Sequence, residues 1–339
     1  MADIWPGSPV YTLLYDEAGT AGRFRAHSVH ASALQRLGVR QNGFRRLLPL
    51  FPLAADRLGR GRSELVVSSS SAFAHRTPTA PDGVHVCYCH SPFRYLWHER
   101  QRAGGEVPRP LRPVLDTVLE RMRGSDVRAA GSVTRLLANS RITQQRIADF
   151  WQRESHVVHP PVEVERFARG EPEDWFLTVG ELVAHKRTEV VLGAAALAGR
   201  TVKVVGTGPE RERLQARFGD RAQFLGRVAD ERLADLYARA RALVVANVEE
   251  FGIAAVEAQA AGRPVLAVDA GGTRETVLDG VTGVLVPEGD LASLAEALRE
   301  VDFDSFDPQV IAGHARRFSV GTFQAGVRRH VEEAWATRG

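Results

Sequence analysis

The chain has 339 residues, 44% of them hydrophobic and 25% charged, which is the composition of a globular protein with enough apolar material for two cores. No apolar run reaches the roughly 18 residues that cross a bilayer, and the opening MADIWPGSPVYT lacks the basic-then-apolar layout of a signal peptide. The sequence therefore predicts a cytoplasmic protein without membrane-spanning helices.

Charge is distributed unevenly between the two halves. Residues 1–158 contain 22 arginines, no lysine and 13 acidic residues, a net charge of +9, whereas residues 159–339 contain 22 basic and 28 acidic residues, a net charge of −6. This asymmetry predicts two domains with different ligands. The basic half suits anionic lipid or a phosphorylated substrate. Nucleic acid is not expected as a partner, because no recognition module or aromatic stacking pattern accompanies the charge.

In the first half, apolar β-rich runs alternate with amphipathic stretches, a pattern typical of parallel sheets covered by helices. Strands are expected at Val10–Tyr15, Glu64–Ser68, Val84–Cys89, Arg135–Ala138 and His156–Val158. Helices are expected at Ser28–Leu37, Leu111–Met122 and Thr143–Phe150. The arginine-rich apolar stretch 44–62 is interpreted either as a contact with anionic lipid or as a buried helix and loop with a solvated basic face.

The two cysteines, Cys87 and Cys89, lie on one predicted strand of this half. Their side chains share a face about 6.5–7 Å apart, which is at or beyond the reach of a disulfide. Together with His85 and His90 they suggest a metal site, but ligands along one strand do not converge on one ion without distortion. Buried thiols are the favoured interpretation, and no metal is expected.

Residues 159–174, HPPVEVERFARGEPED, combine three prolines with many charges and are interpreted as a linker after a first domain of residues 1–158. The second domain, residues 175–317, alternates strands and helices, which predicts a doubly wound sheet with ligands at the carboxyl ends of its strands. Its strands are expected at Trp175–Val179, Val202–Val205, Gln223–Leu225, Ala242–Val245, Pro264–Val268 and Gly283–Val286. Its helices are expected at Lys186–Ala198, Glu210–Arg217, Asp230–Arg239, Phe251–Ala261 and Leu291–Glu300. Residues 318–339, with a helix at Phe318–Trp335, are expected to return to the first domain.

Two loops near predicted strand ends suit a phosphorylated ligand. Gly206 and Gly208 follow a strand and precede a helix, where glycine lets a ligand approach backbone N–H groups. Arg211 replaces the third glycine of the dinucleotide fingerprint, so an ordinary strand-to-helix turn stays an alternative. Lys186 and Arg187 are expected at the start of a helix, where the helix dipole disfavours cations. Since the chain has only two lysines, a compact charge at this place suits a diphosphate, with a solvated loop as the alternative.

The stretch VEEFGIAAVEAQAAG, residues 248–262, is the most informative. Glu249 lies at a strand-to-helix junction and Glu257 follows about two helical turns later, so both carboxylates are predicted to face one cleft. Gly252 lets an anion approach the first-turn amides. The dipole alone favours acids in a first turn, which explains Glu249 but explains Glu257 less well.

With this pattern the chain resembles the family 4 retaining glycosyltransferases of GT-B fold, whose Glu-x7-Glu signature is Glu249 to Glu257 here. VGTGP, FLGRV, LADLYARARALVV and AGRPVLAVDAGGTRETVLDGVTGVLV also match in order and spacing, and CYCHSPFRYLW and ANSRITQQRI are similar to a bacterial mannosyltransferase branch of surface polysaccharide assembly. The resemblance implies an α/β protein of two Rossmann-like domains with parallel sheets facing across a cleft. It also implies that the first domain lacks its first βα unit, because the chain opens at what matches the second strand.

The resemblance further implies a catalytic set and a donor-binding set. The catalytic residues would be His90, Lys186 and Glu249. The donor-binding residues would be Arg187, Gly206, Gly208, Arg227, Val228, Phe251, Gly252, Ile253 and Glu257. Within these sets Glu257 would bind the donor ribose, Glu249 a hydroxyl of the donor sugar and Lys186 the diphosphate.

The implied function is transfer of a hexose, with GDP-mannose as the candidate donor, from a nucleotide sugar to a glycan, lipid-linked or small-molecule acceptor. The reaction would retain the anomeric configuration and need no metal or other cofactor; the D-x-D at Asp302 and Asp304 lies away from the strand ends. Peripheral contact with the inner face of the membrane is a further expectation. Two alternatives stay open: a non-catalytic donor-binding or scaffold relative that needs a partner, and a sugar-nucleotide epimerase of the same fold.

Overall fold

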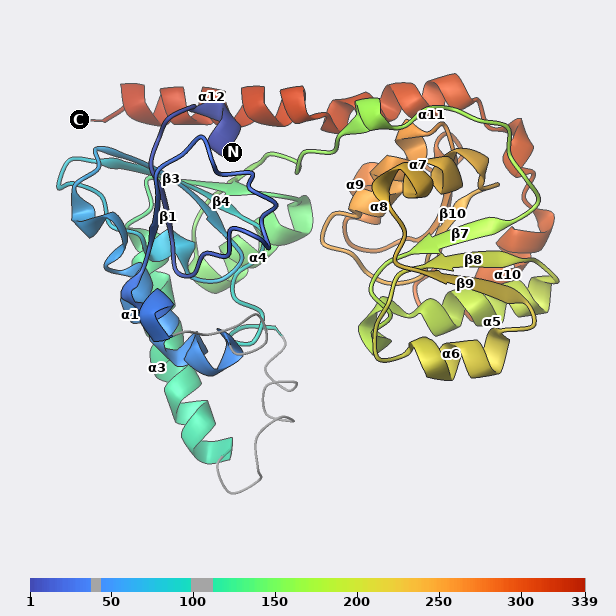
Figure 1. Ribbon diagram of the computed structural model, residues 1–339, viewed down its shortest axis with the longest axis horizontal. Helices are drawn as coiled ribbons and strands as arrows, with labels where there is room; N and C mark the ends of the chain where they lie inside the picture. The colour runs from blue at the N-terminus through green and yellow to red at the C-terminus, as the bar shows by residue number, and fades with distance from the viewer. Residues whose placement is uncertain (38–43, 99–111, 339) are drawn as a thin grey trace. The chain divides into compact units, whose positions relative to one another are not determined.

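The computed structural model describes residues 1–37, 44–98 and 112–338. These residues form two compact units (Figure 1), one of residues 1–158 with 324–339 and one of residues 159–323. The segment 159–174, interpreted from the sequence as a linker, lies in the second unit, where Val162 pairs with Ser319. The last helix, α12 (Val320–Ala336), begins in the second unit and places residues 324–336 in the first.

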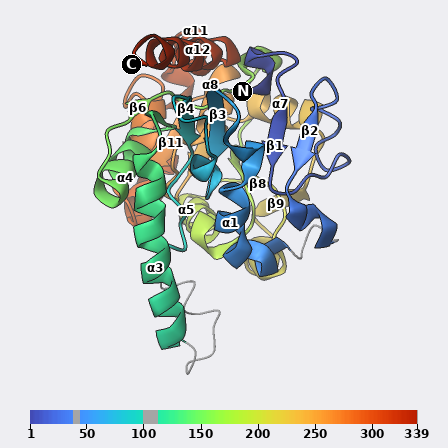
Figure 2. The same ribbon diagram turned by 90° about the vertical axis from the view of Figure 1, so that its left-hand side faces the viewer.

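The first unit contains a four-stranded parallel sheet in the order β3 (Leu65–Ser70), β4 (Val84–Cys89), β5 (Arg135–Ala138) and β6 (His156–Val157). Helices α3 (Arg112–Gly131) and α4 (Arg141–Trp151) contribute Ala130, Ile147 and Trp151 to a core with the inward side chains of β4 and β5. Figure 2 shows α3 extending well beyond the sheet. The expected helix began at Leu111, which lies outside the described residues.

The two strands nearest the N-terminus differ from the expectation. β1 (Val10–Thr12) and β2 (Val29–Ala31) form a separate two-stranded parallel sheet, so the predicted strand at Val10–Tyr15 does not join the larger sheet. The helix predicted at Ser28–Leu37 is wrong, because β2 is followed by the 3-10 helix Ala33–Leu37. The Ser32 hydroxyl donates to the carbonyl of Leu13 at 2.7 Å and accepts the Leu34 amide at 3.2 Å, which stabilises a turn in place of a helix.

The arginine-rich segment of the first unit is only partly buried. It forms the 3-10 helix Phe44–Leu50, α1 (Phe51–Ala55) and the 3-10 helix Leu58–Gly61. Phe51 and Ala55 are buried, whereas Leu50 and Leu53 are 43% and 55% exposed. Lipid contact by this segment stays a prediction. In the part of the chain that the structure describes, no helix is both long enough and apolar enough to span a bilayer.

The core of the first unit contains polar groups as well as thiols. Cys87 and Cys89 are free and buried, and burial raises the pKa of Cys87 to about 12. Asp126 Oδ1 lies 3.1 Å from His75 Nε2, and Asp126 Oδ2 accepts the indole N–H groups of Trp97 and Trp151 at 2.9 and 2.7 Å. Burial alone would raise the pKa of Asp126, but these donors bring it below its usual value. Among the described residues, no group of three or more His, Cys, Asp and Glu side chains is arranged to hold a metal ion.

The buried His85 predicts that the first unit loses stability in acid. Burial, with a smaller contribution from the neighbouring His75, lowers the pKa of His85 from 6.5 to about 3. Between these pH values the unfolded chain binds a proton at His85 that the folded unit does not. The free energy of unfolding is therefore expected to fall by about 1.4 kcal/mol for each pH unit below 6.5, as measured by urea denaturation from pH 7 to 4.

A variant with a non-titrating side chain tests this origin of the pH dependence. His85→Asn is expected to flatten the slope between pH 6.5 and 4. Ser68→Ala removes the hydroxyl that bonds to His85 Nε2 at 2.8 Å but keeps the imidazole, so it should lower stability and leave the slope in place. An unchanged slope in His85→Asn would show that another group titrates.

The second unit contains a six-stranded parallel sheet. Its order is β12 (Gly283–Val286), β11 (Val265–Val268), β10 (Leu243–Val245), β7 (Phe176–Val179), β8 (Val202–Val205) and β9 (Ala222–Gly226). The chain starts at the central β7, builds the sheet outward through β8 and β9, and returns to the other side of β7 with β10. This is the doubly wound order, which predicts ligand binding where the loops after β7 and β10 diverge.

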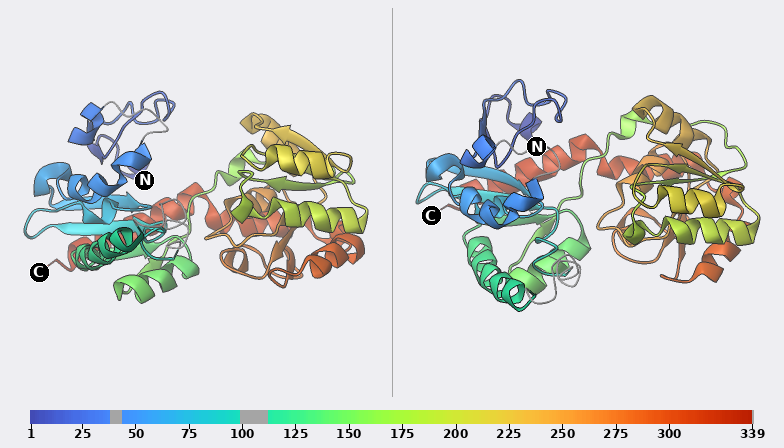
Figure 3. Two further views of the ribbon diagram at one scale, coloured as in Figure 1. Left: turned by 90° about the horizontal axis from the view of Figure 1, so that it is seen from below. Right: turned by 60° about the horizontal axis from the view of Figure 1, so that its bottom comes forward.

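Helices cover both faces of this sheet (Figures 1 and 3). One face packs against α5 (Thr188–Ala198), α6 (Arg211–Phe218) and α10 (Leu291–Glu300), and the other against α7 (Asp230–Arg239) and α8 (Ile253–Ala260). The adjacent β7 residues Phe176 and Leu177 enter opposite layers, as the period of two along a strand requires. Helix α11 (Pro308–Ala315) packs against α8.

Candidate functional site

The loops after β7 and β10 bring a lysine and a glutamate together at the point where the sheet order reverses. Lys186 Nζ donates to Glu249 Oε1 at 2.7 Å, and Asn247 Nδ2 donates to the same oxygen at 2.8 Å. The lysine and glutamate side chains are 29% and 26% exposed, so the pair is half-buried and accessible. Two donors on one oxygen fix the orientation of the Glu249 carboxylate beside one of the chain's two lysines.

The second glutamate of the sequence pattern is held by different partners. The Tyr237 hydroxyl donates to Glu257 Oε2 at 2.9 Å, and Arg166 Nη2 lies 3.7 Å from Glu257 Oε1. Burial raises the pKa of Glu257, although Tyr237 and Arg166 oppose the shift. Burial and the nearby carboxylate also raise the pKa of Tyr237, so the phenol remains a hydrogen-bond donor.

Glu249 lies before the helix that carries Glu257, at the strand-to-helix junction where the sequence predicted it, and that helix begins two residues later than the expected Phe251. Helix α8 begins at Ile253, because Gly252 adopts a left-handed conformation with φ of +90°. Glu249 instead belongs to an extended loop: it pairs with Gly271, and its carbonyl accepts the Gly272 amide at 2.8 Å. Glycine at 272 is required there, since a Cβ would lie 2.2 Å from Phe251 Cα.

The start of α8 offers backbone amides to a ligand, as the sequence suggested for Gly252 and Ile253. The first amides of a helix have no partner within it and carry the positive end of the helix dipole. Ile253 is 48% exposed. Phe251, expected to bind donor, is 3% exposed and packs against His159 and Phe318 with ring centroids 5.4 Å from each, so its side chain anchors the loop in the core.

Lys186 was expected in the first turn of an α-helix, and this prediction is wrong, because Lys186 ends a short 3-10 helix that precedes α5. Ala184–Lys186 form a 3-10 helix, Arg187 is left-handed with φ of +49°, and α5 begins at Thr188. The break turns Lys186 out of the α5 axis, toward the β10 loop that carries Glu249. Arg187 takes another direction, and its Nη1 lies 3.6 Å from Glu288 Oε1.

The glycines of the VGTGP loop are explained by chain packing. A Cβ at Gly206 would lie 1.8 Å from the carbonyl oxygen of Gly180, and a Cβ at Gly208 would lie 2.4 Å from that of Leu182. The Leu182 amide donates to the carbonyl of Thr207 at 2.9 Å, which ties the loop after β8 to the loop after β7. The sequence interpretation, close approach of a ligand, is not needed to account for glycine at these positions.

The remaining predicted residues lie at the end of β9 and in the first unit. Arg227 is exposed, and Val228 packs against the core on the α7 and α8 side of the sheet. His90 directly follows the β4 strand of the first unit, where its Nε2 lies 2.9 Å from the Ser69 hydroxyl and its ring contacts Tyr88 edge-on at a centroid distance of 5.1 Å. The second unit thus brings together Lys186 and Glu249, while His90 belongs to the other unit.

Three residues that orient the two glutamates were not predicted from the sequence. Asn247 lies two positions before Glu249. Residues two apart in an extended segment have side chains on the same face, so this spacing could have indicated that the two side chains lie together. Tyr237 and Arg166 are 20 and 91 positions from Glu257, and no local pattern indicates their contacts with it.

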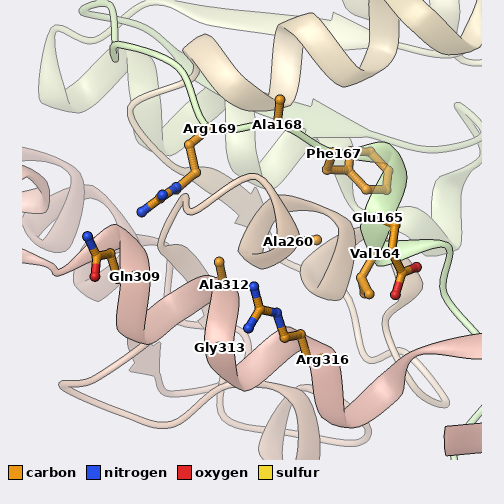
Figure 4. A pocket seen from close by; sticks show the side chains of 10 residues that line it. All are labelled: Val164, Glu165, Phe167, Ala168, Arg169, Ala260, Gln309, Ala312, Gly313 and Arg316. Atoms are coloured by element: carbon orange, nitrogen blue, oxygen red, sulfur yellow. The ribbon is translucent and has the colours of Figure 1, made fainter. Parts of the chain in front are cut away.

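Two surface cavities of the second unit, of about 510 and 600 Å³, lie away from this site. The first is lined by Ala260 at the last turn of α8 (Figure 4), and the second by Glu173 before β7 and Arg239 at the end of α7. Helices of a doubly wound sheet end beside the amino ends of the strands. Neither cavity contains a site residue predicted from the sequence.

Comparison with known proteins shows which proteins the chain resembles. Residues 162–311 match the family described as glycosyl transferases group 1. The chain is 32% identical over 235 residues to D-inositol 3-phosphate glycosyltransferase of Streptomyces avermitilis, covering 58% of this chain and 48% of the relative. The protein of the same description from Geodermatophilus obscurus is 38% identical over 202 residues, covering 49% and 45%. The chain spans about half the length of the curated relatives it matches.

Solved structures extend the likeness to nearly the whole chain. Sucrose-phosphate synthase from Thermosynechococcus elongatus superposes with a TM-score of 0.70 at 17% identity, covering 91% of this chain and 83% of that one. The Anabaena HepE protein in complex with UDP and glucose gives 0.66 at 19% identity, covering 95% and 91%. The chain therefore has the GT-B fold with two Rossmann-like units. The family match likens residues 162–311 to the glycosyl transferases group 1, and the mannosyltransferase branch expected from the sequence stays a prediction.

Proposed function

We propose that this chain is a retaining glycosyltransferase that moves a hexose from a nucleotide-sugar donor to a glycan, lipid-linked or small-molecule acceptor. The observation that carries the proposal is the contact of Lys186 with Glu249 at the switch point of the second sheet. The amides that open α8 lie four residues beyond Glu249 in the chain. A cation, an oriented carboxylate and a helix N-terminus at one place suit an activated sugar with a diphosphate leaving group.

Charge separation in the reaction gives each group a role. Breaking the anomeric C–O bond leaves positive charge on the sugar and negative charge on the diphosphate. Lys186 and the first amides of α8 would stabilise the diphosphate. Glu249 would accept a hydrogen bond from a hydroxyl of the sugar. The acceptor hydroxyl would attack the anomeric carbon from the side of the leaving diphosphate, and a phosphate oxygen would take the proton of that hydroxyl. His90, positioned by Ser69, would contact the reacting sugar. In this scheme Lys186 and the α8 amides supply the positive charge that some transferases draw from a metal.

The similar proteins guide the choice of ligands. UDP is bound in the HepE structures, which share the fold. The curated relatives carry the description D-inositol 3-phosphate glycosyltransferase. UDP-sugars are therefore the first donors to examine, beside the GDP-mannose expected from the sequence, and a phosphorylated polyol is an acceptor to examine beside glycans.

The scarcity of lysine provides a direct test of the donor site. Acetylation by an N-hydroxysuccinimide ester, followed by peptide mass spectrometry, reports Lys186 and Lys203 separately. We expect UDP or GDP at millimolar concentration to slow acetylation of Lys186 severalfold, because the diphosphate would cover its amine. Lys203 lies 3.8 Å above the ring of Trp175 and serves as the internal control, with an unchanged rate.

The outcomes separate the proposal from its competitors. Equal acetylation of Lys186 with and without every nucleotide and nucleotide sugar would contradict the donor site. Protection of Lys186 without transfer to any acceptor, and without loss of donor, would favour a non-catalytic donor-binding relative. Conversion of the donor to an isomeric nucleotide sugar without acceptor would favour an epimerase.

A further inference from the structure

Most arginines of the second unit are paired with acids, and four of the five unpaired ones lie in two places. Residues 159–323 contain 26 acidic and 19 basic residues, 17 of them arginine. Within the described residues, five of these arginines make no ion pair and no side-chain hydrogen bond: Arg169, Arg211, Arg227, Arg316 and Arg317. Arg211 and Arg227 lie beside Gly226, at the carboxyl end of β9. Arg169 and Arg316 line the cavity of about 510 Å³ at the amino end of the sheet.

An unpaired arginine is unexpected in a unit with seven more acids than bases. A guanidinium in such surroundings would ordinarily gain from a nearby carboxylate, and arginine is suited to two-point contact with an anion. Two of the five, Arg169 and Arg316, line one cavity with a single acid, Glu165, so the lining carries a net positive charge that suits an anionic ligand.

The polar side chains of the cavity surround the small residues Ala312 and Gly313 of α11. In Figure 4 the nitrogen-bearing ends of Arg169, Gln309 and Arg316 lie around Ala312, while Glu165 lies on the far side beside Val164. The stem of Arg169 is held in place, because its Cγ packs over Gly262, 3.1 Å from where a Cβ would stand.

The volume and the walls indicate more than a bare anion. A cavity of about 510 Å³ falls within the usual range for small organic ligands, roughly 300–1,000 Å³, and far exceeds one phosphate. Its walls include Val164, Phe167, Ala260 and Ala312. At Gly313, in the middle of α11, a Cβ would meet nothing within 4 Å, so the space over that turn of the helix is open.

We propose that this cavity binds a phosphate monoester with a hydroxylated organic body, of the sugar-phosphate class. Arg169 and Arg316 would hold the phosphate as a dianion, the Gln309 amide would donate to it, and the apolar walls would cover one face of the body. The site is separate from Lys186 and Glu249. It is connected to Glu257 through Arg166, which follows the wall residues Val164 and Glu165 and pairs with Glu257, and through Ala260 at the end of α8.

The test is a calorimetric titration of the full chain with glucose 6-phosphate, inorganic phosphate and glucose. We expect binding of glucose 6-phosphate, weaker binding of inorganic phosphate and none of glucose. Arg169→Ala and Arg316→Ala are each expected to weaken glucose 6-phosphate binding about tenfold or more, the loss of a charge-assisted hydrogen bond. Both side chains are exposed, so these variants should fold.

Matched variants exclude other origins of the binding. Arg317→Ala removes the same charge one residue away, outside the cavity lining, and should leave the affinity unchanged. Gly313→Phe fills the cavity without touching an arginine and should abolish glucose 6-phosphate binding. Lys186→Ala should have no effect on it. Absence of binding at millimolar ligand, equal loss in Arg317→Ala, or loss only in Lys186→Ala would each overturn the proposal.

Discussion

Replacing Glu249 by glutamine is expected to lower the rate of sugar transfer by about a hundredfold or more, in keeping with the loss of one preorganised polar contact in an active site. The carboxylate accepts Lys186 Nζ and Asn247 Nδ2 on one oxygen. Glutamine keeps the size of the side chain but carries no charge, so it would neither hold the ammonium in place nor stabilise positive charge on the reacting sugar. The measurement is kcat and KM with a nucleotide sugar that protects Lys186 from acetylation.

The neighbouring acid provides the matched control. Glu250→Gln changes the same atoms one position along the loop, and its kcat is expected to stay within about twofold of the wild type, because the proposed reaction assigns Glu250 no role. A thermal midpoint for each variant separates loss of chemistry from loss of fold. Full activity in Glu249→Gln would remove this carboxylate from the mechanism.

The pair also predicts that two substitutions are not additive. Lys186→Ala alone should cost transfer at least as much as Glu249→Gln, since the diphosphate loses its cation. In the double variant the second change should cost much less than it does alone, because residues in direct contact act as a unit. Additive losses would mean that the two side chains act on separate parts of the substrate.

The sequence predicted the second unit well because its elements have strong local signals. The β-branched runs at 202–205 and 283–286 and the helices at 230–239 and 291–300 fall where the pattern placed them. At Ser28–Leu37 the apolar spacing resembled a helix, but pairing with β1 made residues 29–31 a strand. That pairing depends on a partner nearly twenty residues away, so no local pattern could indicate it.

For the site, the sequence indicated which residues matter more clearly than how they are arranged. Lys186 and Glu249 are 63 positions apart, and only the sheet order, with β7 beside β10, brings them into contact. The helix predicted at Phe251–Ala261 begins two residues later, at Ile253, because Gly252 adopts a left-handed conformation. A glycine in the sequence is compatible with either the start or the interior of a helix. Which of the two forms depends on tertiary contacts, such as the close approach of Gly272 to Phe251.

The glycines of the VGTGP loop lead to the prediction with the largest effect on stability. In Gly206→Ala the new methyl group would lie 1.8 Å from the carbonyl oxygen of Gly180, and the backbone φ of +137° disfavours any side chain. Because the obstacle is backbone, the loops after β7 and β8 would have to separate. The second unit is expected to lose more than about 4 kcal/mol of unfolding free energy, the range of severe core disruption, as measured by urea denaturation.

Substitutions at two other glycines separate the cost of the left-handed backbone from the cost of the steric contact. Gly180→Ala meets nothing within 4 Å and has no positive φ, so it should change stability by less than about 1 kcal/mol. Gly199→Ala also meets nothing but has a φ of +67°, so it should show the cost of the left-handed backbone alone, about 1 kcal/mol. The excess in Gly206→Ala over Gly199→Ala then measures the contact between the two loops.

The same variant decides what the loop is for. If glycine is needed at 206 only so that a ligand can approach, Gly206→Ala would fold with normal stability and lose nucleotide protection of Lys186. If the loop packing requires it, stability falls whether or not nucleotide is present, and donor binding is lost as a consequence. The 2.9 Å hydrogen bond from Leu182 to Thr207 favours the second outcome, because it shows the loops after β7 and β8 supporting each other beside the lysine. On this view the glycines act on the donor indirectly, by fixing the loop from which Lys186 extends.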